Sequence, residues 1–148
     1  MAKETLLATL NETLREVSEE LAQSDTVLAR MRKELATFRD ILQRARDRES
    51  QANREYEAVF SKYRELLASS KSLPNNSYPV IEKLGELSAE QMKTHDKRLA
   101  AKETVTKYEG QVRAGEARLE MQESKRKSLQ KAWDDLTWQI KKLSAPRR

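Results

Sequence analysis

The sequence predicts an all-α protein, a long antiparallel coiled-coil hairpin of two helices of about 60 residues each. Three observations lead to this fold class. An apolar heptad runs through the first half of the chain, a weaker one runs through the second half, and between them lies the stretch "SLPNNSYP", which holds two of the three prolines. We expect a single domain whose chain folds back near its midpoint.

Composition supports long solvated helices. Of 148 residues 36% are charged and only 5% are aromatic, with 3 glycines and a mean hydropathy of −0.89. These values are not typical of the layered core of a compact enzyme. The chain has no cysteine, which excludes disulfides and thiolate chemistry. It also has no run of about 18 apolar residues, and its first 25 residues are acidic, so we expect a soluble intracellular protein, cytoplasmic or alternatively nuclear.

The first helix is expected over residues 1–72. Positions that step alternately by three and four residues are apolar or aromatic, except for Ser24 and Glu49. In order they are Leu7, Leu10, Leu14, Val17, Leu21, Ser24, Leu28, Met31, Leu35, Phe38, Leu42, Ala45, Glu49, Ala52, Tyr56, Val59, Tyr63 and Leu66. A strict heptad of this length, without glycine or proline, predicts a coiled coil. Such a helix needs a partner of similar length on which to bury its stripe.

The turn is expected over residues 73–79, with irregular structure up to about residue 88. Pro74 ends the first helix, Asn75 and Asn76 favour a turn, and Pro79 suits a first helical turn. Gly85 then divides a short helix at 79–85 from a long one beginning near residue 89.

The second helix is expected over residues 80–144, followed by a basic tail at 145–148. Its heptad is poorer, and around residues 88–101 a frame shifted by one position, which uses Met92, His95 and Leu99, fits better. We interpret this shift as a stutter that locally unwinds the supercoil.

Two polar layers are predicted to set the register of the hairpin, because the polar interruptions of the first helix fall opposite polar residues of the second. These layers are Ser24 opposite Arg126 and near Gln122, and Glu49 opposite Arg98 or Ala101. Charge agrees with this pairing. Residues 1–25 carry a net charge of −4 and residues 124–148 a net charge of +6, so that a hairpin brings opposite charges together.

Candidate protein-binding residues lie beside the heptad. Trp133 falls on it and is expected in the core, whereas Trp138 points away and is either an anchor for a partner or a ring lying across lysine side chains. Additional apolar residues flank the stripe: Leu6, Val27 and Ile41 on one side, and Phe60 and Leu67 on the other. This wider stripe predicts burial against a second hairpin, as a homo- or hetero-oligomer in a four-helix bundle, or against another helical protein.

The basic end of the chain suggests a second kind of partner. Its cationic residues, besides Arg126, are Lys125, Lys127, Lys131, Lys141, Lys142, Arg147 and Arg148. They suit phosphate contacts, so nucleic-acid binding is an alternative. The formal net charge is only +5, however, and we favour pairing with the acidic first segment.

The predicted function is that of a non-enzymatic structural coiled-coil protein, a spacer, tether or assembly subunit of a larger complex. We expect no catalytic residue, no cofactor and no metal site, because His95 is the only histidine and no nucleophile, phosphate loop or ligand cluster is recognisable. In length, charge and expected architecture the chain is also similar to the small stalk proteins of type III export systems. That resemblance implies an alternative role as a stalk-like accessory protein of a secretion or export ATPase.

Overall fold

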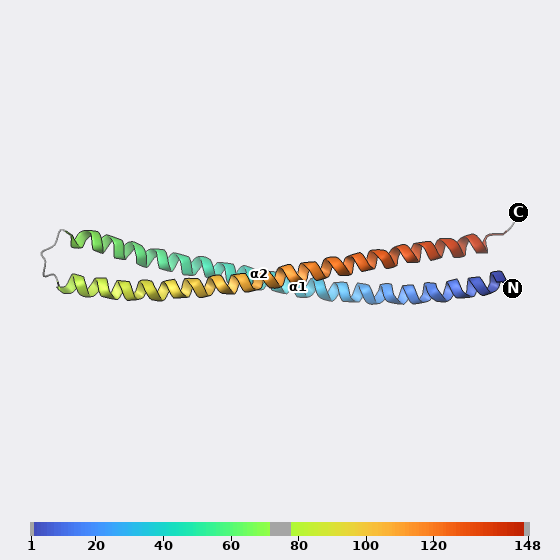
Figure 1. Cartoon of the computed structure of the whole chain (residues 1–148), viewed down its shortest axis with the longest axis horizontal. Helices are drawn as coiled ribbons and strands as arrows, with labels where there is room; N and C mark the ends of the chain where they lie inside the picture. The colour runs from blue at the N-terminus through green and yellow to red at the C-terminus, as the bar shows by residue number, and fades with distance from the viewer. Residues whose placement is uncertain (1, 72–77, 147–148) are drawn as a thin grey trace. The chain divides into compact units, whose positions relative to one another are not determined.

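The fold is an all-α antiparallel hairpin. The computed structural model describes residues 2–71 and 78–146, and these residues form two helices and no strand. Helix α1 spans Ala2–Ser70 and helix α2 spans Tyr78–Ser144. The two helices run in opposite directions and pack against each other, as Figure 1 shows. The predicted fold class is therefore confirmed.

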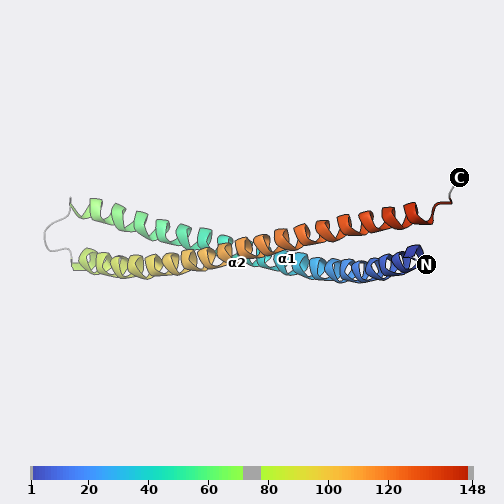
Figure 2. The same ribbon diagram turned by 45° about the vertical axis from the view of Figure 1, so that its right-hand side comes forward.

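The hairpin divides into two units, each made of one segment of α1 and one segment of α2. Unit 1 contains Met1–Thr37 and Arg113–Arg148, and unit 2 is the continuous segment Phe38–Val112. In Figure 2 the blue part of α1 and the red part of α2 belong to unit 1, and the green and yellow parts belong to unit 2.

The predicted heptad forms the contact between the helices. We use a for the column of Leu7 and d for the column of Leu10 in α1, and a and d for the columns of Leu84 and Leu87 in α2. Every a and d side chain of α1 from Leu7 to Leu66 is buried or half-buried, while most of the others are exposed. The same holds for α2 from Val80 to Leu143, which includes its polar a and d positions. Burial of this stripe stabilises both helices.

Pro74, Asn75 and Asn76, on which the turn prediction rests, lie outside the described residues. Helix α2 begins at Tyr78, so Pro79 stands in the first helical turn, where its missing N–H is tolerated. The helix continues through Gly85, so between Tyr78 and Ser88 the irregular structure expected up to about residue 88 is not formed. A glycine inside a helix costs only about 1 kcal/mol. Packing of Leu84 and of Leu87, which is buried, outweighs that cost.

The expected stutter is also not formed. Between residues 91 and 101 the original frame stays in the seam, because Gln91, Thr94 and Arg98 are half-buried. In the shifted frame Met92 is 69% and Leu99 43% exposed, and only His95 is half-buried, beside the ring of Tyr56. A shift by one position would put α2 out of phase with its buried residues on either side of the segment. Long polar side chains tolerate half-burial because their aliphatic stems pack while their heads reach water. The apolar residues of the shifted frame are therefore left on the surface.

Small residues allow close packing inside each unit. In unit 1, a Cβ atom placed on Gly115 would lie 3.1 Å from Cδ1 of Leu35, so the glycine makes room for a side chain that is 3% exposed. In unit 2, Ala45 and Ala52 are buried between larger residues such as Leu42 and Val59. Alternation of large and small side chains lets the two helices approach closely at these positions.

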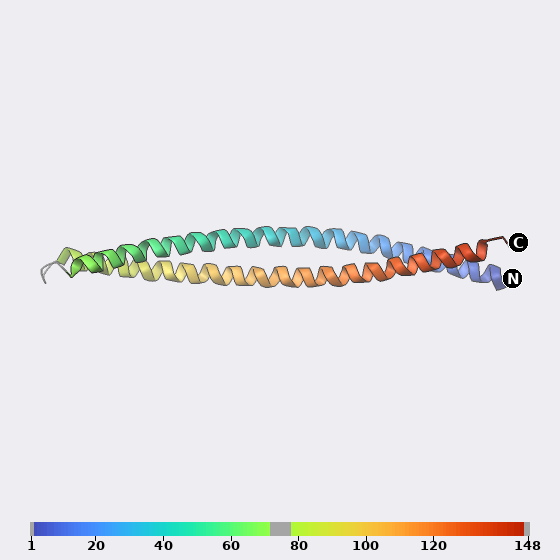
Figure 3. The same ribbon diagram turned by 90° about the horizontal axis from the view of Figure 1, so that it is seen from above.

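Ion pairs beside the seam show which residues of α1 and α2 lie opposite each other. In unit 1, Arg32 pairs with Glu123, with 3.5 Å between Nη2 and Oε1. In unit 2, Arg46 lies 3.9 Å from Glu109 and Lys97 lies 2.9 Å from Glu55. The arginine pairs join e positions of both helices, and the lysine pair joins g positions, as two antiparallel helices require. Figure 3 shows the green part of α1 beside the yellow part of α2 within unit 2.

Candidate protein-interaction site

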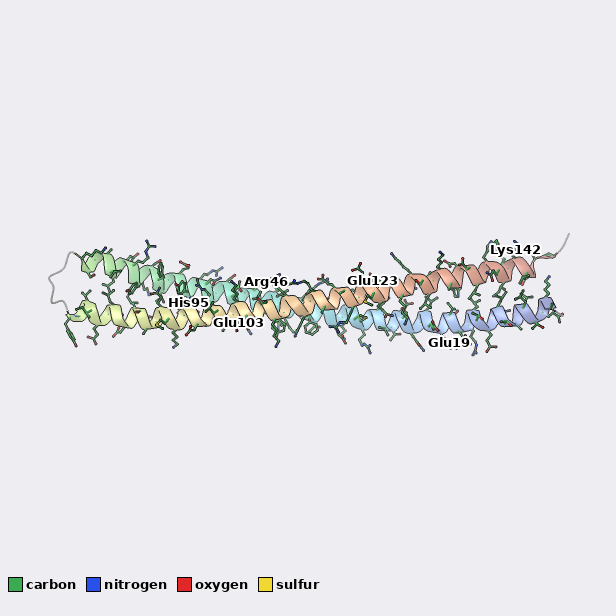
Figure 4. The ribbon with its side chains drawn as sticks, in the orientation of Figure 1. Glu19, Arg46, His95, Glu103, Glu123 and Lys142 are labelled. Atoms are coloured by element: carbon green, nitrogen blue, oxygen red, sulfur yellow. The ribbon has the colours of Figure 1, made fainter. Side chains whose placement is uncertain are left out.

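The first exposed apolar site is at the end of unit 1 where the two helix ends meet. Trp138 of α2 is 61% exposed, and Nζ of Lys142 lies 4.9 Å from the centre of its ring. Lys142 also lines an open hollow with residues from both helices, and Figure 4 labels it near the end of α2. The hollow is lined by Ala2, Lys3, Leu6, Lys142, Leu143 and Ala145. We call Trp138 and this hollow the open-end site.

Trp138 was interpreted from the sequence either as an anchor for a partner or as a ring lying across lysine side chains, and the structure has one observation in favour of each. The ring is covered on part of one side by a lysine one turn later, and it still exposes most of its surface to solvent. Leu6, half exposed at 48%, adds an aliphatic side chain to the same hollow that Lys142 lines. An exposed ring with one ammonium group over it, next to a hollow that the same lysine lines together with Leu6 and Lys3, can bind an apolar segment that carries a negative charge.

Trp133 lies in the seam of unit 1. It is half-buried, and its Nε1 donates a hydrogen bond to Oγ of Ser18 on α1 at 3.1 Å. The bond satisfies the polar atom of a packed indole, which is the usual requirement for a tryptophan in a core. The hydrogen bond therefore joins α2 to α1 at a point five residues before Trp138.

The first polar layer is formed by Ser24 and Gln122. Ser24 is 4% exposed, and its Oγ accepts a hydrogen bond from Nε2 of Gln122 at 3.2 Å. Arg126, expected opposite Ser24, turns instead to Asp25, whose Oδ1 accepts from its Nε at 2.6 Å. This bond to the guanidinium lowers the pKa of the Asp25 carboxyl below its ordinary value and raises the pKa of Arg126.

The second predicted layer is arranged differently. Glu49 and Arg98 are both half-buried and line one hollow of unit 2. The Arg98 guanidinium carbon lies 4.0 Å from the centre of the Tyr56 ring, and its Nη2 donates to Nδ1 of His95 at 3.0 Å. Among the described residues Glu49 has no ion pair. The cation–π contact with Tyr56 takes the place of the expected contact between Glu49 and Arg98.

The apolar residues that flank the seam of α1 differ in how far they are exposed. Val27, Ile41 and Phe60 are half-buried beside the seam, and Leu67 is 40% exposed. Val27 lines a polar hollow of unit 1 with Ser24, Gln122 and Lys125. Phe60 stacks on Tyr56, with 5.9 Å between ring centres, and its ring lies under the guanidinium of Arg64.

The structure exposes large apolar residues that were not predicted as binding residues. They are Tyr78, Ile81, Met92, Leu99 and Met121. Met92 and Leu99 belong to the shifted frame that the sequence suggested as part of the seam. These two residues do follow an apolar period in the sequence, but they lie on the surface of α2 and not in the seam.

The basic end does not form a paired face along its length. In the described part of this segment, Arg126 is the residue that pairs with a carboxylate. Lys125, Lys127, Lys131 and Lys141 are exposed, and Lys142 lies at the open-end site. Arg147 and Arg148 lie outside the described residues.

Residues 2–71 and 78–146 contain no group of three or more histidine, aspartate or glutamate side chains arranged to hold a metal ion. Neither described helix has a stretch both long enough and apolar enough to cross a membrane. No protein-family model, no curated protein and no solved structure matches the chain.

Proposed function

We propose that the chain is a non-enzymatic structural and interaction protein that assembles other proteins into a complex, with the open-end site as its docking point. The supporting observation is the exposed Trp138 held by Lys142 beside an apolar hollow. Tryptophan is enriched among the residues that dominate binding energy at protein interfaces, and it loses little conformational entropy when it binds. The spacer, tether and assembly roles all require such a fixed point of attachment.

The charge of the open-end site indicates the chemistry of the partner. Lys3 and Lys142 line the hollow, and Lys141 is exposed on the same helix end. A partner segment with one or two apolar side chains flanked by carboxylates would complement both features. The apolar contact would supply most of the affinity, and the charges would guide association.

Affinity capture with the full chain as bait tests the proposal. Trp138→Ala should reduce retention of a specific protein partner at least about 30-fold, because loss of an interface tryptophan costs about 2 kcal/mol or more. Met121→Ala is a matched control, since Met121 is similarly exposed on the same helix but does not line the hollow. The control should retain the same partner.

Salt and nuclease distinguish the nucleic-acid alternative. A tryptophan-centred contact should survive an increase from about 50 to 200 mM salt, whereas phosphate contacts made by several cations weaken by orders of magnitude. Equal retention by the wild type and by Trp138→Ala would contradict the proposed site. Retention of nucleic acid in place of protein would contradict the proposed function.

A further inference from the structure

One side of unit 2 exposes large apolar side chains outside the seam. On α2, Tyr78 is 76%, Ile81 61%, Met92 69% and Leu99 43% exposed, and on α1 Leu67 is 40% exposed. Phe60 of α1 is half-buried at the same side. We call these six residues the apolar flank. Isolated exposed apolar residues are ordinary, but several of them along one side of a helix pair indicate an interface.

The heptad places these residues on one side of the hairpin. The e positions of α1 and α2 face each other there, as the pair of Arg46 with Glu109 shows. Further along the same side, Asn53 of α1 and Leu99 and Lys102 of α2 line one hollow. Phe60 and Leu67 follow Asn53 by one and two heptads, and Ile81 precedes Lys102 by three. Tyr78, Met92 and Leu99 form the neighbouring b column of α2.

The apolar character is confined to unit 2. In unit 1 the corresponding e positions are polar: Asn11, Ser18, Asp25 and Arg32 on α1, and Glu116, Glu123, Gln130 and Thr137 on α2. The flank is therefore not part of an apolar side that runs the whole length of the helices. It is a local surface that extends along α2 from Tyr78 to Leu99, and His95, labelled in Figure 4, lies within it.

The two borders of the flank carry opposite charge. The border on α1 has Arg64 and Lys71 together with one carboxylate, Glu57, and all three are exposed. The border on α2 has three exposed carboxylates, Glu82, Asp96 and Glu103. Figure 4 labels Glu103 on α2. A surface that is basic along one edge and acidic along the other is complementary to itself when one copy is turned so that the edges meet.

We propose that the apolar flank binds a second copy of this chain, with a two-fold axis parallel to the helices. In this arrangement α1 of each copy lies over α2 of the other, which brings each basic border onto an acidic border. Both copies then contribute Phe60, Leu67 and Met92 to the core of a four-helix bundle in unit 2. An axis perpendicular to the helices that placed α1 over α1 would bring like-charged borders together.

Shape supports the same arrangement. A Cβ atom on Gly85 would meet nothing within 4 Å, and Ser88 and Ala89 follow it on the exposed side of α2. This small-residue segment lies between Ile81 and Met92, where it leaves space for a large side chain of the second copy. Leu67 of that copy is positioned to fill the space, because it lies near the turn end of α1 as Gly85 lies near the turn end of α2.

The inference deepens the proposed assembly role by naming a partner for a surface separate from the open-end site. Sedimentation velocity of the full chain, over about 1 to 100 µM, tests it. The wild type should form a dimer, and Met92→Glu and Leu67→Glu should each raise the dimer dissociation constant at least about tenfold, because each buries a charge. Met121→Glu is the matched control. Met121 is 74% exposed but lies in unit 1, and its replacement should leave the dimer intact.

A charge exchange tests the orientation. Lys71→Glu and Glu82→Lys should each weaken self-association, because each places like charges against each other at two symmetry-related contacts. A mixture of the two variants should form a mixed dimer that is stronger than either variant alone. Circular dichroism of every variant checks that the helices remain formed.

Each outcome bears on the inference. A wild type that is monomeric at about 100 µM, or a Met121→Glu chain that dissociates as readily as Met92→Glu, would overturn it. So would loss of a captured heterologous protein from Met92→Glu without any change in sedimentation, since the flank would then belong to another protein. Trp138→Ala should dimerise normally, so a failed dimer and a failed open-end site give different results.

Discussion

Asp25 and Arg126 form a short ion pair between the two helices of unit 1, and they show how one residue can depart from a predicted pairing. The sequence aligned Arg126 with Ser24, which would have placed a guanidinium against a buried hydroxyl. Arg126 instead reaches sideways to Asp25, at 2.6 Å, and Gln122 takes the hydroxyl. A charged head that can leave the seam for an exposed carboxylate avoids the cost of desolvation.

The Asp25 pair leads to a pH prediction. The hydrogen bond from Arg126 lowers the pKa of Asp25 below its ordinary value of 3.8, and Lys97 likewise lowers the pKa of Glu55 below 4.5. A carboxyl whose pKa is lower in the folded state stabilises the fold above its unfolded pKa. That contribution is lost as the pH falls through the folded pKa. We therefore expect the stability of the hairpin to decrease as the pH falls below about 4.5.

NMR titration of the side-chain carboxyl carbons checks this assignment. Arg126→Gln should raise the Asp25 pKa toward 3.8 and leave Glu55 unchanged, and Lys97→Gln should do the reverse. Each variant is thus the control for the other. If both carboxyls respond equally to either change, the shifts come from overall charge and not from the two pairs.

At the scale of the helix, the glycines of α2 offer a matched comparison. None of the three glycines has a positive φ, so alanine fits the backbone at each. A Cβ atom at Gly110 would meet nothing within 4 Å, whereas one at Gly115 would lie 3.1 Å from Cδ1 of Leu35. We predict that Gly110→Ala raises the free energy of unfolding by about 0.5–1 kcal/mol through helix propensity.

Gly115→Ala should gain less than Gly110→Ala, because Leu35 must move to admit the new methyl group. Chemical denaturation of both variants measures the difference directly. If Gly115→Ala stabilises the chain as much as Gly110→Ala does, Leu35 has room to adjust and the close packing at Gly115 is not a constraint.

The elements also show what the sequence could and could not predict. The seam of α1 was predictable position by position, because a 3.5-residue period over many turns leaves one face for burial. In α2 the period was ambiguous near residues 91–101, where polar residues occupy the seam and apolar residues lie one position away. The sequence contains both frames. Only the phase set by Leu87 and Val105, both buried, decides between them.

The two possible heptad frames of α2 also explain which candidate sites could be predicted from the sequence and which could not. Trp138 was predictable because a heptad defines an outward position as clearly as an inward one. The apolar flank was not, because Met92 and Leu99 were assigned to a locally unwound seam. In the structure both residues lie outside the seam, exposed on one side of α2. Their exposure there is one of the observations from which a second copy is inferred.

Across the whole chain, burial within the seam is uneven, and this predicts uneven stability. In α1 no seam residue before Ser24 is fully buried, and in α2 none of the described residues after Val112 is. Leu35, Leu42 and Val59, by contrast, are at most 7% exposed. Amide exchange from a helical hairpin follows local opening, which is easiest where the least apolar surface is buried. Residues 7–21 of α1 and 126–143 of α2 should therefore open more readily than residues 35–59.

Native-state hydrogen exchange measured by mass spectrometry, at a concentration where the chain has one association state, checks this expectation. Peptides from 7–21 and 126–143 should exchange faster than peptides from 35–59 and 105–112, and the two fast segments should exchange together because they pack on each other in unit 1. Trp133→Phe, which removes the hydrogen bond to Ser18, should accelerate exchange in both fast segments and leave 35–59 unchanged. Acceleration confined to α2 would show that Ser18 and Trp133 do not couple the two helix ends.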